Sequence, residues 1–430
     1  MWQLEEAIVC LSSEKGDILT LTQGTAGLFR NRFIRAILLS GILLQIGIWV
    51  RNFAILLYVM ERTDNNPFAV SLISVAEFAP IFLFSFIGGT YADRWRPKRT
   101  MVLCDLLSAL SVFIVLLTII FGTWEAVFLV TFISAILSQF SQPSAMKLFK
   151  VHVPAEQIQV GMAMFQTLMA IFLIVGPLLG TFVYQRFGIH TAISVMGVAF
   201  LLSAGALTFL PPDKKDYDRP ENDFTRELAD GFRYVWHNKV LTALGGVFIA
   251  AGFGIGIIQP LGIFVVIERL GLPKENLQWL MMVNGVAMLL GGGAIISFSK
   301  KVAAQKLLAT GLLVSAISVA GVGLSTSLVI TLGFQFLSGL FYPCIHTGIN
   351  TLILNATEEK FVGRVNGVLN PMFMGAMVIM MSLAGWLKTR FSLVGMYEIS
   401  GALFFVGMLL IVPVFNISAA QRRYRTADKE

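Results

Sequence analysis

Two charged side chains lie inside long apolar stretches of the sequence. Arg51 is in the stretch 33–60 and Glu77 is in the stretch 68–92. An unpaired arginine or carboxylate in a membrane-spanning helix costs at least about 2.5 kcal/mol on insertion scales. At a helical rise of about 1.5 Å per residue, both lie about 13 Å from the same membrane surface, which predicts that they face each other or share a wet cavity. If a conformational change separates them, the carboxylate can take up or release a proton. The alternative is a permanent structural ion pair that tethers the two helices.

The elements that must position these charges are apolar stretches of about 20 residues, the length at which a helix crosses a bilayer. The chain has 430 residues, of which 56% are hydrophobic and 13% charged, and this composition is typical of membrane proteins. Twelve such stretches recur, at about 33–60, 68–92, 101–121, 125–147, 161–184, 189–210, 240–267, 276–298, 304–323, 327–349, 364–387 and 393–416. The sequence therefore predicts an all-α membrane protein with twelve transmembrane helices.

The basic residues give the orientation of these helices. If both termini are cytoplasmic, 25 of the 32 Lys and Arg lie in segments at the inner face, as the positive-inside rule requires. The net charge of +7 therefore reflects topology and does not indicate nucleic-acid binding. The expected organisation is a cytoplasmic N-terminal tail 1–29, a six-helix half 30–210, a cytoplasmic central loop 211–239, a second six-helix half 240–416 and a cytoplasmic tail 417–430.

The two halves resemble each other at an offset near 200 residues, in three places and in the same order. The corresponding pairs begin at Gly88 and Gly292, at Gln142 and Tyr342, and at Pro154 and Ala356. Three matches in register favour duplication of a six-helix unit.

The loop after the second apolar stretch carries a recognisable motif. The segment from Gly89 to Arg99 has the sequence GTYADRWRPKR, and the segment from Gly363 to Gly367 has the sequence GRVNG. Over residues 30–416 the chain resembles the major facilitator superfamily, and within it the drug:proton antiporter subgroup that contains macrolide-efflux and enterobactin-exporter proteins. The resemblance implies the major facilitator fold, a substrate cavity between the halves near the membrane midplane, alternating access and a monomeric protein.

The same loop is a candidate gate. A carboxylate at the inner end of a helix can pair with basic groups or with the positive N-terminus of a neighbouring helix, and so can favour one arrangement of the halves. The alternative is a simple topology anchor. Asp105, further along the chain, is either a partner in this cluster or a carboxylate that snorkels to the interface. The candidate gating residues are Gly89, Asp93, Arg94, Lys98, Arg99 and Asp105.

Buried amides are candidates for the cavity wall, although amides in membrane helices more often bond to another helix. The candidates are Gln139, Gln142, Gln166, Gln259, Asn284, Gln335, Asn366 and Asn370. Gly176, Pro177 and Gly180 resemble the core of an antiporter motif, which implies export, and ordinary Gly/Pro helix packing is the alternative.

Other classes of protein lack their motifs. The sequence has no GxxxxGK[ST] for a nucleotide and no HExxH, and its three cysteines form no CxxC pair, so we expect no enzyme, cofactor or metal site. We expect a secondary active transporter of the bacterial plasma membrane, with protons, the lipid bilayer and a small-molecule substrate as partners. The favoured function is proton-driven export of a hydrophobic or amphiphilic compound, such as a drug, a macrolide or a siderophore-like molecule. The alternatives are an importer or flippase of a lipid-like metabolite and, ranked lower, a transporter-like sensor or a membrane enzyme.

Overall fold

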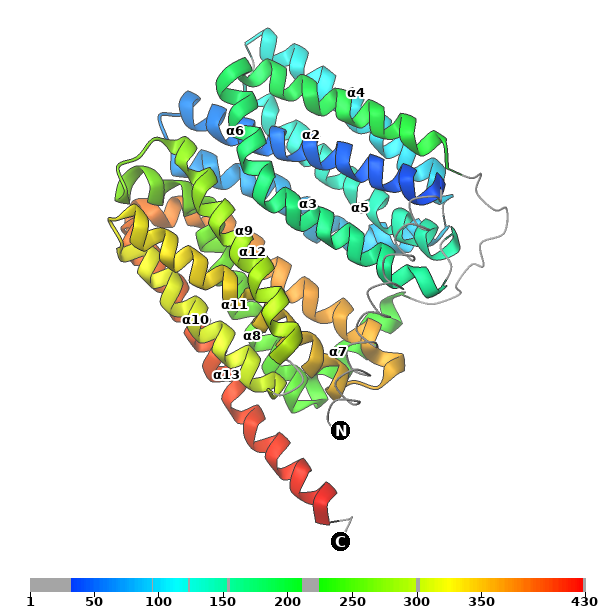
Figure 1. Cartoon of the computed structure of the whole chain (residues 1–430), viewed down its shortest axis with the longest axis vertical. Coiled ribbons are helices and arrows are strands. Elements are labelled where there is room, and N and C mark those ends of the chain that lie inside the picture. Colours follow the sequence, from blue (N-terminus) through cyan, green and yellow to red (C-terminus); the bar gives the residue numbers. More distant parts are fainter. Residues whose placement is uncertain are drawn as a thin grey trace, which may run out of the picture.

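The computed structural model describes residues 32–94, 96–122, 124–152, 155–210, 224–298 and 302–427, and the regular elements of this part are all helices. Two bundles lie side by side (Figure 1). The first, called here the N-half, contains α2 (Arg32–Arg62), α3 (Pro67–Arg94), α4 (Pro97–Ile120), α5 (Ala126–His152) and α6 (Ala155–Thr208). The second, the C-half, contains α8 (Lys239–Phe264), α9 (Leu277–Phe298), α10 (Ala304–Leu324), α11 (Leu328–Ala356), α12 (Val362–Arg390) and α13 (Leu393–Ala427), with the short helices η1 (Val265–Arg269), η2 (Lys274–Asn276) and η3 (Glu359–Phe361).

Long apolar helices suit a bilayer because each satisfies its own backbone hydrogen bonds. In the described part, ten helices are long and apolar enough to cross a membrane. Two features separate this number from the twelve that the sequence predicts. One candidate span, Thr167–Thr208, has 42 residues, about twice the length that a bilayer core requires. In α5 the described apolar part is shorter, Ala126–Ser141.

The long helix α6 is broken at Gly188. This residue has φ 76° and ψ −177°, a backbone conformation that is essentially restricted to glycine. Before the break, Gly176 packs on Trp49 of α2, and Gly180 packs on Phe53 further along α2. Residue numbers therefore rise together along the two helices, so the first arm of α6 runs parallel to α2.

The second arm of α6 runs the opposite way. Ala199 packs on Gly47 of α2, and the later residue Ser203 bonds to the earlier residue Ser40. Residue numbers therefore rise on one helix as they fall on the other. The sequence prediction of two stretches, 161–184 and 189–210, corresponds to these two antiparallel arms.

The halves pack tightly at one end of the molecule, called here the Thr63 end because it holds the turn between α2 and α3. The C-half core takes in Leu57, Met60 and Val70 from the N-half. On α12, a Cβ added to Gly385 would lie 2.5 Å from the Pro67 carbonyl oxygen, so the two backbones touch. The opposite end of the molecule, the α7 end, holds the connection between the halves.

That connection contains a helix which the sequence analysis treated as part of a polar loop. Helix α7 (Phe224–His237) packs on the C-half, where Tyr234 stacks on Phe361 at 4.5 Å between ring centroids and Val235 is buried. Its other face leaves three large apolar side chains exposed: Leu228, Phe232 and Trp236. The spacing of four residues places these three on one helical face.

Candidate functional site

A cavity of about 850 Å³ lies between the two halves. It extends along much of the bundle, from Val70 near the Thr63 end to Ile353, close to the α7 end of α11. The wall is mainly apolar, and aromatic residues come from both halves: Trp49, Phe53, Phe78, Phe248, Phe373, Phe404, Tyr342 and Tyr397. A cavity of this size and character suits a drug-sized ligand.

The charged pair that the sequence singled out lies at this wall. Glu77 of α3 lines the cavity, whereas Arg51 of α2 is 4% exposed and is not among the lining residues. The two are joined through Asn52, which also lines the cavity. Arg51 donates from Nε and Nη2 to Asn52 Oδ1, at 2.9 and 2.6 Å, and Asn52 Nδ2 donates to Glu77 Oε1 at 2.9 Å. The predicted proximity is therefore present, but an amide connects the pair in place of a direct contact.

Asn52 is not among the site residues predicted from the sequence. A polar residue directly beside a membrane-embedded arginine was the available signal. Gln45, one heptad earlier on α2, also lines the cavity and was missed in the same way.

Of the eight predicted cavity amides, five line the cavity: Gln259, Asn284, Gln335, Asn366 and Asn370. Asn284 Nδ2 also donates to the Gln335 carbonyl oxygen at 3.0 Å, so this amide links α9 to α11 as well. Gln139 is not a lining residue, and its Nε2 donates to Ser138 Oγ at 3.1 Å. Gln142 and Gln166 lie outside the residues whose side chains are described. Contact with a substrate stays a prediction for all eight.

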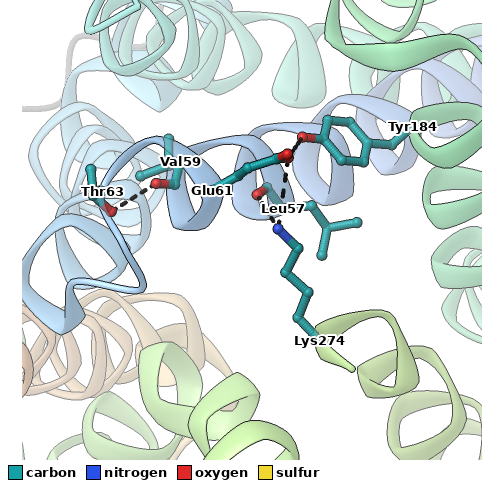
Figure 2. A network of polar contacts seen from close by, with 6 residues as sticks. All are labelled: Leu57, Val59, Glu61, Thr63, Tyr184 and Lys274. Carbon is teal, nitrogen blue, oxygen red and sulfur yellow. Dashed lines mark hydrogen bonds and ion pairs between the residues drawn. The ribbon is translucent and has the colours of Figure 1, made fainter. Parts of the chain in front are cut away.

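Polar contacts join the halves at the Thr63 end (Figure 2). The Tyr184 hydroxyl of α6 donates to Glu61 Oε2 of α2 at 2.7 Å. Lys274 of the C-half reaches across, with its ammonium 3.8 Å from Glu61 Oε2, and it donates to the Leu57 carbonyl oxygen at 3.2 Å. These contacts, together with the backbone contact at Gly385, close the Thr63 end of the interface.

The candidate gating residues divide into two groups. Gly89, Asp93 and Arg94 lie outside the residues whose side chains are described, so their proposed contacts stay predictions. Lys98, at the start of α4, donates to the carbonyl oxygens of Thr208, at 2.8 Å, and Leu210, and thus caps the end of α6. Arg99 follows it and is exposed, with interactions of its own.

Asp105 is buried in the interior of the N-half and is only 3% exposed. Ser203 Oγ donates to its Oδ2 at 2.6 Å, and Ser40 Oγ lies 2.7 Å from Ser203 Oγ. The carboxylate therefore connects α4 to α6 and, through the serine pair, to α2. It does not snorkel to the interface, and its part in the gate stays a prediction.

The predicted antiporter-like motif lies where α6 meets α2. Gly176 and Gly180 face Trp49 and Phe53, and a Cβ added to either glycine would lie within 2.6 Å of those side chains. Pro177 lies between them inside the helix. Because Trp49 and Phe53 also line the cavity, the motif lets α6 support the cavity wall from behind.

The comparisons with known proteins agree with this architecture. The sequence model of one protein family, the Major Facilitator Superfamily, matches residues 37–273 and 246–430 of this chain. An uncharacterized MFS-type transporter of Bacillus subtilis, YkuC, is 24% identical, over 94% of this chain and 97% of its own length. Macrolide efflux protein A of Streptococcus pyogenes is also 24% identical, over 85% of this chain and 92% of its own.

Among solved structures, the nucleoside transporter NupG is similar in fold, with a TM-score of 0.73 at 12% identity over 88% of this chain and all of its own. The family match covers both halves and confirms the resemblance seen in the sequence. The chain therefore belongs to the Major Facilitator Superfamily and is a multi-pass cell-membrane transporter rather than an enzyme.

Proposed function

We propose that this protein exports a hydrophobic or amphiphilic small molecule in exchange for protons, by alternating access of the cavity between its halves. In this proposal the chain is a monomer with twelve spans and cytoplasmic termini, where the two arms of α6 count as two spans and α5 counts as one.

The observation that carries the proposal is Glu77 in the wall of a large aromatic cavity. Of the membrane-embedded pair, only the carboxylate borders the cavity, because Arg51 lies behind the wall. A carboxylate in that position is accessible to protons and to a cationic group on a substrate, while the aromatic walls suit an apolar body. An amphiphilic cation therefore fits this cavity better than an anion does.

In the proposed orientation both termini are cytoplasmic. The Thr63 end then faces outward, and the contacts among Tyr184, Glu61 and Lys274 keep the outer side closed. Opening that end would expose Glu77 to external protons, and protonation would weaken its hold on a bound cation. The name of macrolide efflux protein A supports the direction and the kind of cargo.

Ethidium accumulation in bacterial cells tests the proposal. Cells that express the wild type should retain less ethidium than cells with an empty vector, and an uncoupler should abolish the difference. Glu77→Gln should behave like the empty vector. Ser74→Ala is the matched control, because Ser74 borders the same cavity one turn away but carries no ionisable group, and it should behave like the wild type. Membrane levels of each variant are measured by immunoblot. If Glu77→Gln exports ethidium with full dependence on the proton gradient, Glu77 is not the coupling residue.

A further inference from the structure

The side chain between the two membrane-embedded charges has an orientation set by its neighbours. A guanidinium only donates hydrogen bonds, and an ionised carboxylate only accepts them. Asn52 satisfies both, since its oxygen accepts from Arg51 and its nitrogen donates to Glu77. A rotated amide would point its NH₂ at the guanidinium and its oxygen at the carboxylate, so the two charges fix one orientation.

Asn52 bridges Arg51, behind the wall, and Glu77, at the cavity. Arg51 and Glu77 are both described, and no ion pair within 4.0 Å joins them directly. Among the described residues, Arg51 Nη1 is buried without a hydrogen-bond partner, and the side-chain hydrogen bonds of the guanidinium go to Asn52. Removal of the amide would leave Arg51 with no acceptor and Glu77 without this donor.

Other charged groups do not compete for Glu77. Helices α5, α8 and α12 pack against α3. Over residues 126–146, 240–264 and 365–387, these helices contain no Asp, Glu, Lys, Arg or His. On α2, which carries Arg51, the next charged residue is Glu61, at the Thr63 end. His346 of α11 is a titratable residue that lines the same cavity, but within the described part of the chain it is Asn52 that hydrogen-bonds to Glu77.

We infer that Asn52 is a positioning residue for the coupling carboxylate, because it holds Glu77 at the cavity wall and fixes its position relative to Arg51. The role of Glu77 in coupling rests on the proposed function. The position of Asn52 between Arg51 and Glu77 does not, because its hydrogen bonds are independent of any cargo. The Asn52 amide favours the ionised form of Glu77, since it donates to the carboxylate.

The variant Asn52→Leu tests this inference with little change in volume. Leucine keeps a side chain between Arg51 and Glu77 but neither donates nor accepts. The matched control is Gln45→Leu, which removes a cavity-lining amide from the same face of α2 without touching either charge. Asn52→Gln is the conservative variant, because its longer amide retains both hydrogen-bonding roles.

The readout is infrared difference spectroscopy of the full chain in lipid nanodiscs, titrated with pH. The carboxyl band of Glu77 is identified by its loss in Glu77→Gln. We expect Asn52→Leu to move the midpoint of this band to higher pH by about one unit or more, Gln45→Leu to leave it unchanged, and Asn52→Gln to restore most of the shift. An unmoved or lowered midpoint in a folded Asn52→Leu protein would overturn the inference. Because this measurement needs no transport, failure of ethidium export would contradict the proposed function and leave this result standing.

Discussion

The contact at the Thr63 end makes a quantitative prediction about the balance between conformations. Lys274 bonds across the halves to Glu61 at 3.8 Å and to the Leu57 carbonyl oxygen at 3.2 Å, with side-chain exposures of 19% for Lys274 and 64% for Glu61. An exposed ion pair is worth about 0.2–1 kcal/mol, and a hydrogen bond from a charged group to a carbonyl adds about 1 kcal/mol after discounting for solvent. The variant Lys274→Met should therefore cost the closed arrangement about 1–2 kcal/mol, which changes the ratio of closed to open molecules about 5- to 30-fold.

Electron-spin distance measurements can detect a change of this size. Nitroxide labels are placed at Asn65 in the N-half and at Thr326 in the C-half, both exposed near the Thr63 end, after replacement of the three native cysteines. Lys274→Met should transfer population from the short to the long distance. Glu61→Gln should do so less, because it removes the ion pair but leaves the hydrogen bond from Lys274 to Leu57.

The matched control is another ion pair near the Thr63 end that does not cross between the halves. Lys388 of α12 and Glu268 of η1 lie 2.5 Å apart, and both belong to the C-half. Lys388→Met should leave the distance distribution unchanged. If it shifts the distribution as much as Lys274→Met does, or if neither variant shifts it, the contact from Lys274 does not hold this end closed.

Three further predictions concern a close backbone contact, a glycine backbone conformation and a buried hydrogen bond. Gly385→Val should hold the Thr63 end apart, because a Cβ there would lie 2.5 Å from the Pro67 carbonyl oxygen. A Cβ added to Gly367 on the same helix meets no atom within 4 Å, so Gly367→Val should not; equal label distances in both variants would contradict this. Gly188→Ala should lower the melting temperature, since its backbone conformation costs any other residue about 1–3 kcal/mol, while helical Gly205→Ala should not; equal melting temperatures would refute the strained fold-back. Asp105→Asn should fold with near-native stability because it still accepts from its serine partner, and Asp105→Leu should lose about 1–3 kcal/mol; a stable leucine variant would show that the buried hydrogen bond is dispensable.

Composition and the recurring apolar stretches were enough to predict that the regular elements of this protein are long apolar helices. Apolar stretches of bilayer length leave little freedom, because backbone groups in lipid must bond within a helix. The break at Gly188 was not predicted as such, although it lies between the two stretches expected at 161–184 and 189–210. Helix α7 was not predicted, because charges mixed with aromatics over 224–237 were taken as a polar loop, although the four-residue spacing from Leu228 to Trp236 was available.

The site was predictable only in part. The number of residues from the outer end of each helix predicted that Arg51 and Glu77 lie at the same depth, since both distances are measured along straight helices from the same surface. The rotation of each helix about its own axis cannot be counted in this way, and it determines that Asn52 and not Arg51 faces Glu77. Rotation likewise separates Gln259, which borders the cavity, from Gln139, which does not. These outcomes depend on packing between helices that are distant in sequence.

The proposed proton-coupled mechanism requires that the contacts closing the Thr63 end can be broken at a small cost in free energy. The described contacts between the halves include the backbone contact of Gly385 with Pro67 and the ion pair of Glu61 with Lys274, while Gly375 faces the Phe82 side chain and Gly285 faces the Ile174 side chain. Packing of this kind holds helices together in lipid without the hydrophobic gain available in water. A change of one unit in the pKa of a carboxylate corresponds to about 1.4 kcal/mol, which is similar to the cost expected for loss of the Lys274 contact. In the proposed mechanism, proton binding at Glu77 and loss of the Lys274 contact are therefore similar in free energy, so protonation can shift the balance between the closed and open arrangements.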